Sequence, residues 1–126
     1  MKRLWLGVIL TAILLVAGIV IGSFMVHTGD TIAGILDNAA DAALSGNFQT
    51  ATALAEDAHN RWDTAWHWIA AAADHAPMDE IDSLFAQILV YADTGAEQEF
   101  AAHCKRISML VSAVGEAHSF NWWNLL

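Results

Sequence analysis

An uncharged apolar run near the N-terminus constrains this chain more than any other feature. The run is 23 residues long, from Leu4 to Val26, and it directly follows Lys2 and Arg3. As a helix rising about 1.5 Å per residue it would be roughly 35 Å long, enough to cross a hydrocarbon core of about 30 Å. We therefore predict a membrane anchor at residues 1–26, which contacts lipid through residues 4–26.

The charges around the run predict its orientation. Lys2 and Arg3 precede it, and the next lysine or arginine is Arg61. Because the cytoplasmic side of a span carries the excess of basic residues, we place the N-terminus in the cytoplasm and residues 27–126 outside the cytoplasmic membrane, in a single-pass protein. A cleaved signal peptide and a buried core helix are the alternatives. The run exceeds the roughly 7–15 residues of a signal h-region and no Ala-x-Ala follows it, which favours an uncleaved anchor.

One face of the apolar run carries small residues at helical spacing. They are Gly7, Thr11, Gly18 and Gly22, with spacings of 4, 7 and 4. Small residues let two helix backbones approach closely in lipid, so this face predicts packing against another helix. The alternative explanation is that glycine is simply common in membrane helices.

The part of the chain after the run is strongly acidic. Residues 27–126 hold all 14 acidic residues and three basic ones, Arg61, Lys105 and Arg106, which gives a formal charge of −11. Such a domain repels phosphate, so we exclude nucleic acid as a partner. Solubility explains the charge, and attraction of cations or of a basic partner is the alternative. Cys104 is the single cysteine and lies in an apolar stripe, so we expect a buried core residue rather than a disulfide.

Apolar residues after the run recur at helical spacing, and no stretch alternates as a strand would. Four segments have this pattern, at about residues 30–45, 48–69, 81–92 and 100–114. The second segment alternates spacings of three and four like a heptad seam, at Phe48, Ala51, Ala55, Ala58, Trp62, Ala65 and Ile69. The fourth segment repeats that spacing at Phe100, Cys104, Ile107, Val111 and Val114.

Turn residues separate these segments. Gly46-Asn47 and Thr94-Gly95 are typical of helix ends, and a helix must stop before Pro77. Short connections favour antiparallel neighbours. We predict an all-α protein with one N-terminal transmembrane helix and a small antiparallel four-helix bundle of two αα-hairpins at residues 27–118. The first bundle helix can continue from the span, because only Gly29 weakly interrupts it. A geometry like that of tetratricopeptide repeats is the alternative, although their 34-residue pattern is incomplete here.

Histidines and carboxylates share one face of the second predicted helix. Glu56, His59, Asp63 and His67 are spaced 3, 4 and 4, and the first two form a Glu-x-x-His pair. Di-iron bundles need that pair twice, and the sequence holds it once. These four residues are weak metal candidates, a solvated polar face is the favoured explanation, and we predict no metal and no cofactor. Together with His75, two of these histidines also allow a metal or pH sensor, because histidine titrates near neutrality.

Tryptophan is concentrated in two places. Trp62, Trp66 and Trp68 fall within seven residues, and we expect the first in the core, the second covering it and the third partly exposed. Exposed tryptophan anchors partners or lies among lipid headgroups, whereas packing between helices explains the same residues. The apolar tail at residues 119–126 is expected to dock on the bundle or on a second protein. Our candidate binding residues are Trp66, His67, Trp68, Asp74, His75, Trp122 and Trp123.

The chain resembles the small Gram-positive membrane proteins of domain-of-unknown-function family 4363. The resemblance rests on the Lys/Arg start before one span, the turn at Gly46, the RWDTAWHW stretch, the Asp74-His75 pair before Asp79-Glu80-Ile81, and the final Asn124-Leu125-Leu126. It implies a single-pass, all-helical protein without an assigned activity, and it supplies no catalytic residue.

No catalytic arrangement is evident in the sequence. None of the serines lies in a Gly-x-Ser-x-Gly elbow, and no glycine loop that would hold a phosphate is present. We therefore expect a non-enzymatic interaction or scaffolding module at the outer face of the cytoplasmic membrane. Its partner would be another membrane or envelope protein, or a second copy of the chain.

Overall fold

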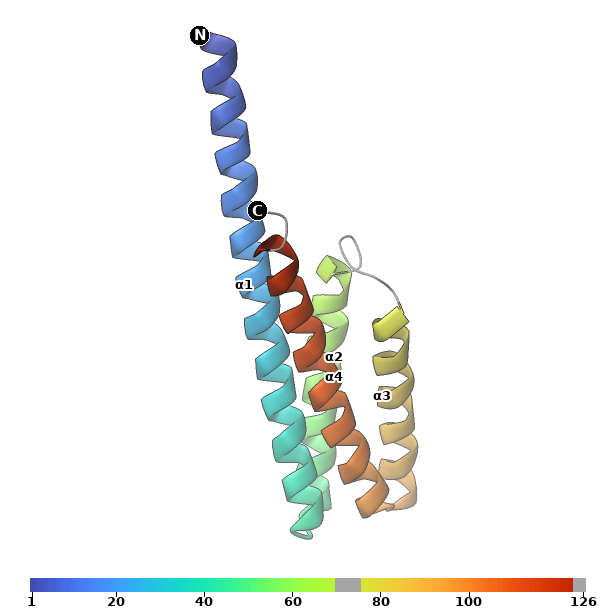
Figure 1. The fold of residues 1–126 in the computed structure, drawn as a ribbon. Helices are drawn as coiled ribbons and strands as arrows, with labels where there is room; N and C mark the ends of the chain where they lie inside the picture. The colour runs from blue at the N-terminus through green and yellow to red at the C-terminus, as the bar shows by residue number, and fades with distance from the viewer. Residues whose placement is uncertain (70–75, 124–126) are drawn as a thin grey trace.

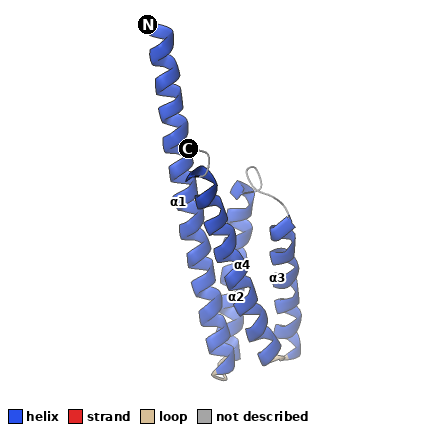
Figure 2. Ribbon diagram, in the orientation of Figure 1, coloured by secondary structure: helices blue, strands red, loops and turns tan. Residues whose placement is uncertain are grey.

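Four helices form the part of the chain that the computed structural model describes, residues 1–69 and 76–123 (Figure 1). They are α1 (Lys2–Leu44), α2 (Phe48–Ile69), α3 (Ala76–Thr94) and α4 (Glu97–Trp123). Side chains are described for residues 1–67 and 76–117. Within these bounds the chain forms helices and turns without a strand (Figure 2), so the prediction of an all-α fold with a four-helix bundle is confirmed.

The predicted span and the first bundle helix are one continuous helix. α1 runs through 43 residues, and its N-terminal part projects alone beyond the other helices (Figure 1). Large apolar side chains such as Leu10, Ile13 and Val16 are exposed on this projecting part. By length and composition α1 can cross a membrane, and no other described helix can. Gly29 has a low helix propensity, yet α1 continues through it without a break.

The two predicted glycine turns are confirmed. Gly46 has a φ of 81° and Gly95 a φ of 72°, the left-handed conformation that favours glycine after a helix end. After α1 the Asn47 amide donates to the carbonyl of Ala42 at 2.9 Å, and after α3 the Ala96 amide donates to that of Tyr91 at 3.1 Å. Both bonds use helix-end carbonyls that would otherwise lack a partner.

The helices form two antiparallel hairpins, as the short connections predicted. α1 packs broadly against α4 and α2, α3 packs against α4, and the backbones of α2 and α3 stay farther apart. Pro77 lies in the first turn of α3, where its missing N–H costs no helical hydrogen bond. The likeness to tetratricopeptide repeats stays a prediction.

α1 and α4 pack closely because a glycine of each helix faces the backbone of the other helix. A Cβ placed on Gly29 would lie 3.1 Å from the carbonyl oxygen of Val111, and one on Gly115 would lie 3.4 Å from that of Met25. A side chain at Gly29 would therefore push the two backbones apart, whereas a Cβ at Gly115 would just touch the opposite backbone. They also fix the register, with Gly115 beside the end of the apolar run.

Aromatic side chains fill the wider side between α2 and α3. The Trp62 indole Nε1–H donates to Asp82 Oδ1 at 2.7 Å. The ring of His59 packs against that of Phe85 with their centroids 4.9 Å apart. Large rings thus bridge two neighbouring helices whose backbones lie farther apart than those of the other neighbouring pairs, and they help to join the two hairpins.

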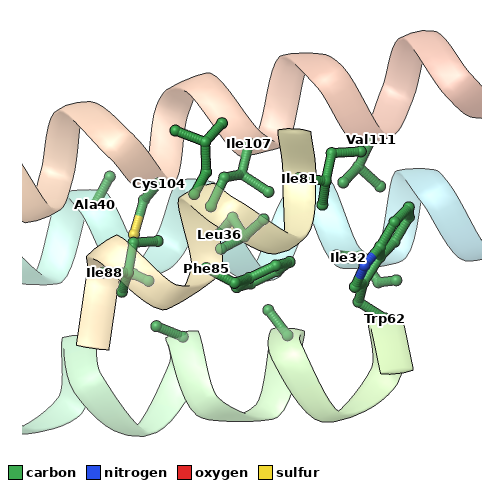
Figure 3. Packing of buried hydrophobic residues seen from close by; sticks show 14 of the residues in the cluster. Ile32, Leu36, Ala40, Trp62, Ile81, Phe85, Ile88, Cys104, Ile107 and Val111 are labelled. Atoms are coloured by element: carbon green, nitrogen blue, oxygen red, sulfur yellow. The ribbon is translucent and has the colours of Figure 1, made fainter. Parts of the chain in front are cut away.

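The core lies along the apolar seams that the sequence predicted (Figure 3). Phe85 lies between α2 and the Leu36 side chain of α1, and Trp62 approaches Ile32 at one end of the cluster. The predicted seam residues of α2 and α4 are buried or partly buried, apart from Ile69, whose side chain is outside the described residues. The largest buried side chains are Trp62, Phe85, Phe100, Ile32, Leu36, Met78, Ile81, Ile88, Ile107 and Val111.

The helix α4 continues past residue 118, where we predict the bundle to end, up to Trp123. The backbone of residues 119–123 is therefore helical, and the domain boundary at residue 118 stays a prediction. A five-residue segment can be helical here because it propagates an existing helix and needs no new nucleus. Docking of residues 119–126 on the bundle or on a partner stays a prediction.

Candidate functional site

A groove of about 430 Å³ opens between α1 and α2, next to the point where the apolar run ends. One part of its wall is apolar and the rest is polar. Its lining residues are Phe24, His27, Thr28, Thr31, Ile32, Asn60, Arg61, Thr64 and Ala65. A surface of this kind suits an amphipathic group, with an apolar part against Phe24 and Ile32 and a polar part near Arg61.

Hydrogen bonds within each helix already engage several polar groups of the groove. The Thr31 hydroxyl donates to the His27 carbonyl at 2.8 Å, and the Thr64 hydroxyl donates to that of Asn60 at 2.9 Å. Arg61 Nε donates to Asp57 Oδ2 at 3.0 Å. Sequence reasoning missed the groove, because its two walls come from segments about 35 residues apart and only the pairing of α1 with α2 brings them together.

The tryptophans of α2 lie at the same end of the bundle. Trp62 is buried, and Trp66 is partly buried and stacks on it with ring centroids 6.3 Å apart. The expected core position of the first and covering position of the second are therefore confirmed. His67 is exposed, and its Nδ1 lies 2.9 Å from the Asp63 carbonyl oxygen, which requires the tautomer with hydrogen on Nδ1.

Several candidate binding residues cannot be placed in this site. Asp74 and His75 lie outside the described residues. Trp68, Trp122 and Trp123 belong to described helices, but their side chains lie outside the described ones. A joint binding surface of these residues with Trp66 and His67 stays a prediction.

The proposed metal ligands of α2 do not gather around one point. His59 Nε2 lies 3.6 Å from Asp63 Oδ1. Eight residues separate His59 from His67, about 12 Å along a helix, whereas two ligands of one zinc each lie about 2 Å from the metal. Among the described residues no three histidine, cysteine or acidic side chains are arranged to hold a metal. Nothing described therefore favours a metal site built on Glu56, His59, Asp63 and His67. The metal or pH sensor with His59, His67 and His75 stays a prediction.

The small-residue face of α1 has two different surroundings. Gly7 and Thr11 are exposed, and the Thr11 hydroxyl donates to the Gly7 carbonyl at 2.9 Å. Gly18 and Gly22 are buried. The face therefore divides at about residue 18, and packing of Gly7 and Thr11 against another helix stays a prediction.

A family model described as a domain of unknown function, DUF4363, matches residues 20–125. The chain belongs to this family. The DUF4363 match begins inside the apolar run and ends beyond the last described residue of α4, so it includes the groove and all four bundle helices. No curated protein and no solved structure matches the chain.

Cys104 is the one thiol of this DUF4363 protein, and it is fully buried between α4 and α1. Burial, with a smaller contribution from the negative charge of Asp37, raises the pKa of the Cys104 thiol from 9.0 to about 12. Because the thiolate is the reactive form, this cysteine is inert near neutral pH.

The raised pKa of Cys104 predicts how stability changes at alkaline pH. The unfolded thiol ionises near pH 9 while the folded one keeps its proton until about pH 12. The contribution of Cys104 to the free energy of unfolding is therefore fully present below pH 9. Between pH 9 and about pH 12 the free energy of unfolding falls by about 1.4 kcal/mol per pH unit. Urea unfolding of the wild type and Cys104→Ala from pH 8 to 11 measures this slope. Equal slopes for the two proteins would contradict the assignment.

Proposed function

We propose that this chain is a membrane-anchored, non-enzymatic helical module that binds or braces another envelope protein at the outer face of the cytoplasmic membrane. In this proposal α1 crosses the membrane with Lys2 and Arg3 inside, and the bundle lies outside. The continuity of α1 is the observation that carries the proposal. One helix without a break serves as both anchor and core element, so the position of the bundle is coupled to the membrane.

The electrostatics of the bundle favour a different protein over a second copy as partner. All three basic residues after the run form ion pairs: Arg61 with Asp57, Lys105 with Asp37 and Asp41, and Arg106 with Glu80. The remaining charge is strongly negative, so two bundles side by side repel each other. A partner with a basic surface is attracted instead, at a rate that salt reduces.

The site chemistry supports a binding role over catalysis. The Cys104 thiol is buried and protonated at neutral pH. The polar groups that line the groove between α1 and α2 are those of His27, three threonines, Asn60 and Arg61, which forms an ion pair with Asp57. These groups can orient and hold a ligand or a partner segment, and none of them is an activated nucleophile.

Crosslinking in intact cells tests this function. We place one cysteine at the membrane-proximal end of the bundle, His67→Cys, in a Cys104→Ala background, and add a membrane-impermeant maleimide–diazirine reagent. The control is Asp93→Cys, an exposed position near the far end of α3. After illumination we expect one discrete protein adduct from position 67 and none from position 93, and we expect 0.5 M salt to weaken the adduct, because exposed charges are screened at that concentration.

The other outcomes separate the parts of the proposal. If the reagent labels neither position until the cells are lysed, the bundle does not lie outside and the orientation is wrong. If both positions are labelled and neither gives a protein adduct, the orientation holds and the partner-binding role is wrong. Adducts between two copies of the chain would show that the chain self-associates and that its partner is not a different envelope protein.

A further inference from the structure

We infer that the last two turns of α4 enter the outer leaflet beside α1, so that the chain contacts lipid through a second segment besides residues 4–26. This inference rests on the proposed anchoring of α1 and adds a partner surface to it. The surface is the C-terminal end of α4, and the partner is the outer leaflet of the lipid bilayer.

The register of α1 and α4 places the end of α4 at the level of the apolar run. A Cβ on Gly115 would meet the Met25 carbonyl oxygen and the Val26 Cα, both at 3.4 Å. From there α4 continues for eight residues to Trp123, which is about 12 Å along an α-helix. Since the helices are antiparallel, α4 ends near the level of Gly18, well inside the run (Figure 1).

The burial pattern of α1 independently supports this overlap. The buried positions that face the bundle are spaced 4, 3, 4 and 3 and continue into the apolar run: Gly18, Gly22, Met25, Gly29 and Ile32. Ile19, Val20, Ile21 and Phe24 on the other faces are exposed. The bundle-facing seam therefore extends about two turns from Val26 into the apolar run. At this level α4 is the helix beside α1 (Figure 1).

The charge boundaries of the two helices coincide. On α4 the last aspartate, glutamate, lysine or arginine is Glu116, next to Gly115, and the one titratable side chain in residues 117–126 is His118. On α1 the run ends at Val26, and the first acidic residue after it is Asp30. The uncharged ends of both helices thus begin at one level. The uncharged end of α4 contains Trp122 and Trp123, the residue type that is enriched at the membrane interface.

The length of the run argues against a membrane surface that leaves α4 in water. If the surface were at Gly18, the span would consist of Leu4 to Ala17, 14 residues or about 21 Å, against a hydrocarbon core of about 30 Å. The last carbonyls of α4 lack helical partners and need polar groups around them, so α4 ends within the outer leaflet and does not cross to the inner one. The DUF4363 match, residues 20–125, includes the whole α4 segment and most of the α1 segment.

Spin-label depth measurements on the full chain test the inference. Single cysteines replace Trp123, Leu10 or Met109 in a Cys104→Ala background, and each protein is reconstituted in phosphatidylcholine–phosphatidylglycerol nanodiscs. Power saturation compares the accessibility of each label to oxygen, which partitions into lipid, with that to a water-soluble nickel complex. We expect the oxygen-to-nickel ratio at position 123 to exceed that at the exposed bundle position 109 several-fold, and to approach that at position 10.

Each other outcome has a distinct meaning. A lipid-like label at position 10 with a water-like label at position 123 would overturn the inference and leave the anchoring intact. Water-like labels at both positions would overturn the anchoring and the inference together. Asn121→Cys provides a second reading of the same helix end if circular dichroism shows that Trp123→Cys has lost its helical structure.

Discussion

Gly29→Leu is expected to destabilise the bundle by about 3 kcal/mol, the upper part of the range for overpacked cores. The new Cβ alone would lie 3.1 Å from the Val111 carbonyl oxygen, and this backbone atom cannot rotate away as a side chain could. The helices α1 and α4 must therefore separate along their closest contact. Urea unfolding of the full chain in detergent, followed by circular dichroism, measures the loss.

Gly34→Leu is the matched control for this prediction. It makes the same chemical change five residues later on α1, where a Cβ meets no heavy atom within 4 Å. Leucine has a better helix propensity than glycine by roughly 0.5–1 kcal/mol, so this variant should be slightly more stable than the wild type. Equal destabilisation by the two variants would show that the close approach of α1 and α4 is not what Gly29 provides.

Trp62→Ala is expected to have an effect at least as large, about 3–5 kcal/mol, because it removes the largest buried side chain of the core. The indole lies between α2 and α3, so these two helices lose the largest side chain between them, while the packing of α1 on α4 still joins the two hairpins. Trp66→Ala is the comparison, since the side chain stacked on Trp62 is only partly buried. Its loss should be clearly smaller in the same unfolding experiment.

Trp62→Phe separates the hydrogen bond from the packing. Phenylalanine keeps most of the buried ring area but cannot donate to Asp82 Oδ1, which accepts at 2.7 Å in the wild type. Asp82 is exposed, and its carboxylate can be hydrated when the donor is lost. We therefore expect the loss of this hydrogen bond to lower the free energy of unfolding by about 1 kcal/mol. A double-mutant cycle of Trp62→Phe with Asp82→Ala measures the coupling. A cycle that closes at zero would assign the role of Trp62 to packing alone.

The sequence was sufficient for features that depend on neighbouring residues. The α2 seam follows from the regular spacing of Ala51, Ala55, Ala58 and Trp62, and a buried stripe of that period needs no knowledge of its partner. The turns at Gly46 and Gly95 were predictable for the same reason, because glycine favours the left-handed conformation that ends a helix wherever that helix packs.

Features that depend on helix pairing were not predictable from the sequence. The proximity of Gly115 to Met25 involves residues 90 positions apart, and neither has a local signal for the other. The groove at His27 and Arg61 likewise exists only after α1 and α2 have packed. The length of α4 was underestimated because residues 119–123 are helical as a continuation of a packed helix, not by their own propensity.

In the membrane-anchored protein that we propose, the unbroken α1 would couple the angle of the bundle to the lipid thickness. The segment of α1 beyond the run, residues 27–44, is about 27 Å long. Membrane helices adjust to thinner or thicker bilayers by tilting, on average by about 20°. Because α1 is continuous from the run into the bundle, a tilt of that size would move the distal turn at Gly46 sideways by about 9 Å. In this proposal the bilayer thickness sets the position of the far end of the protein, and with it the partners that this end can reach.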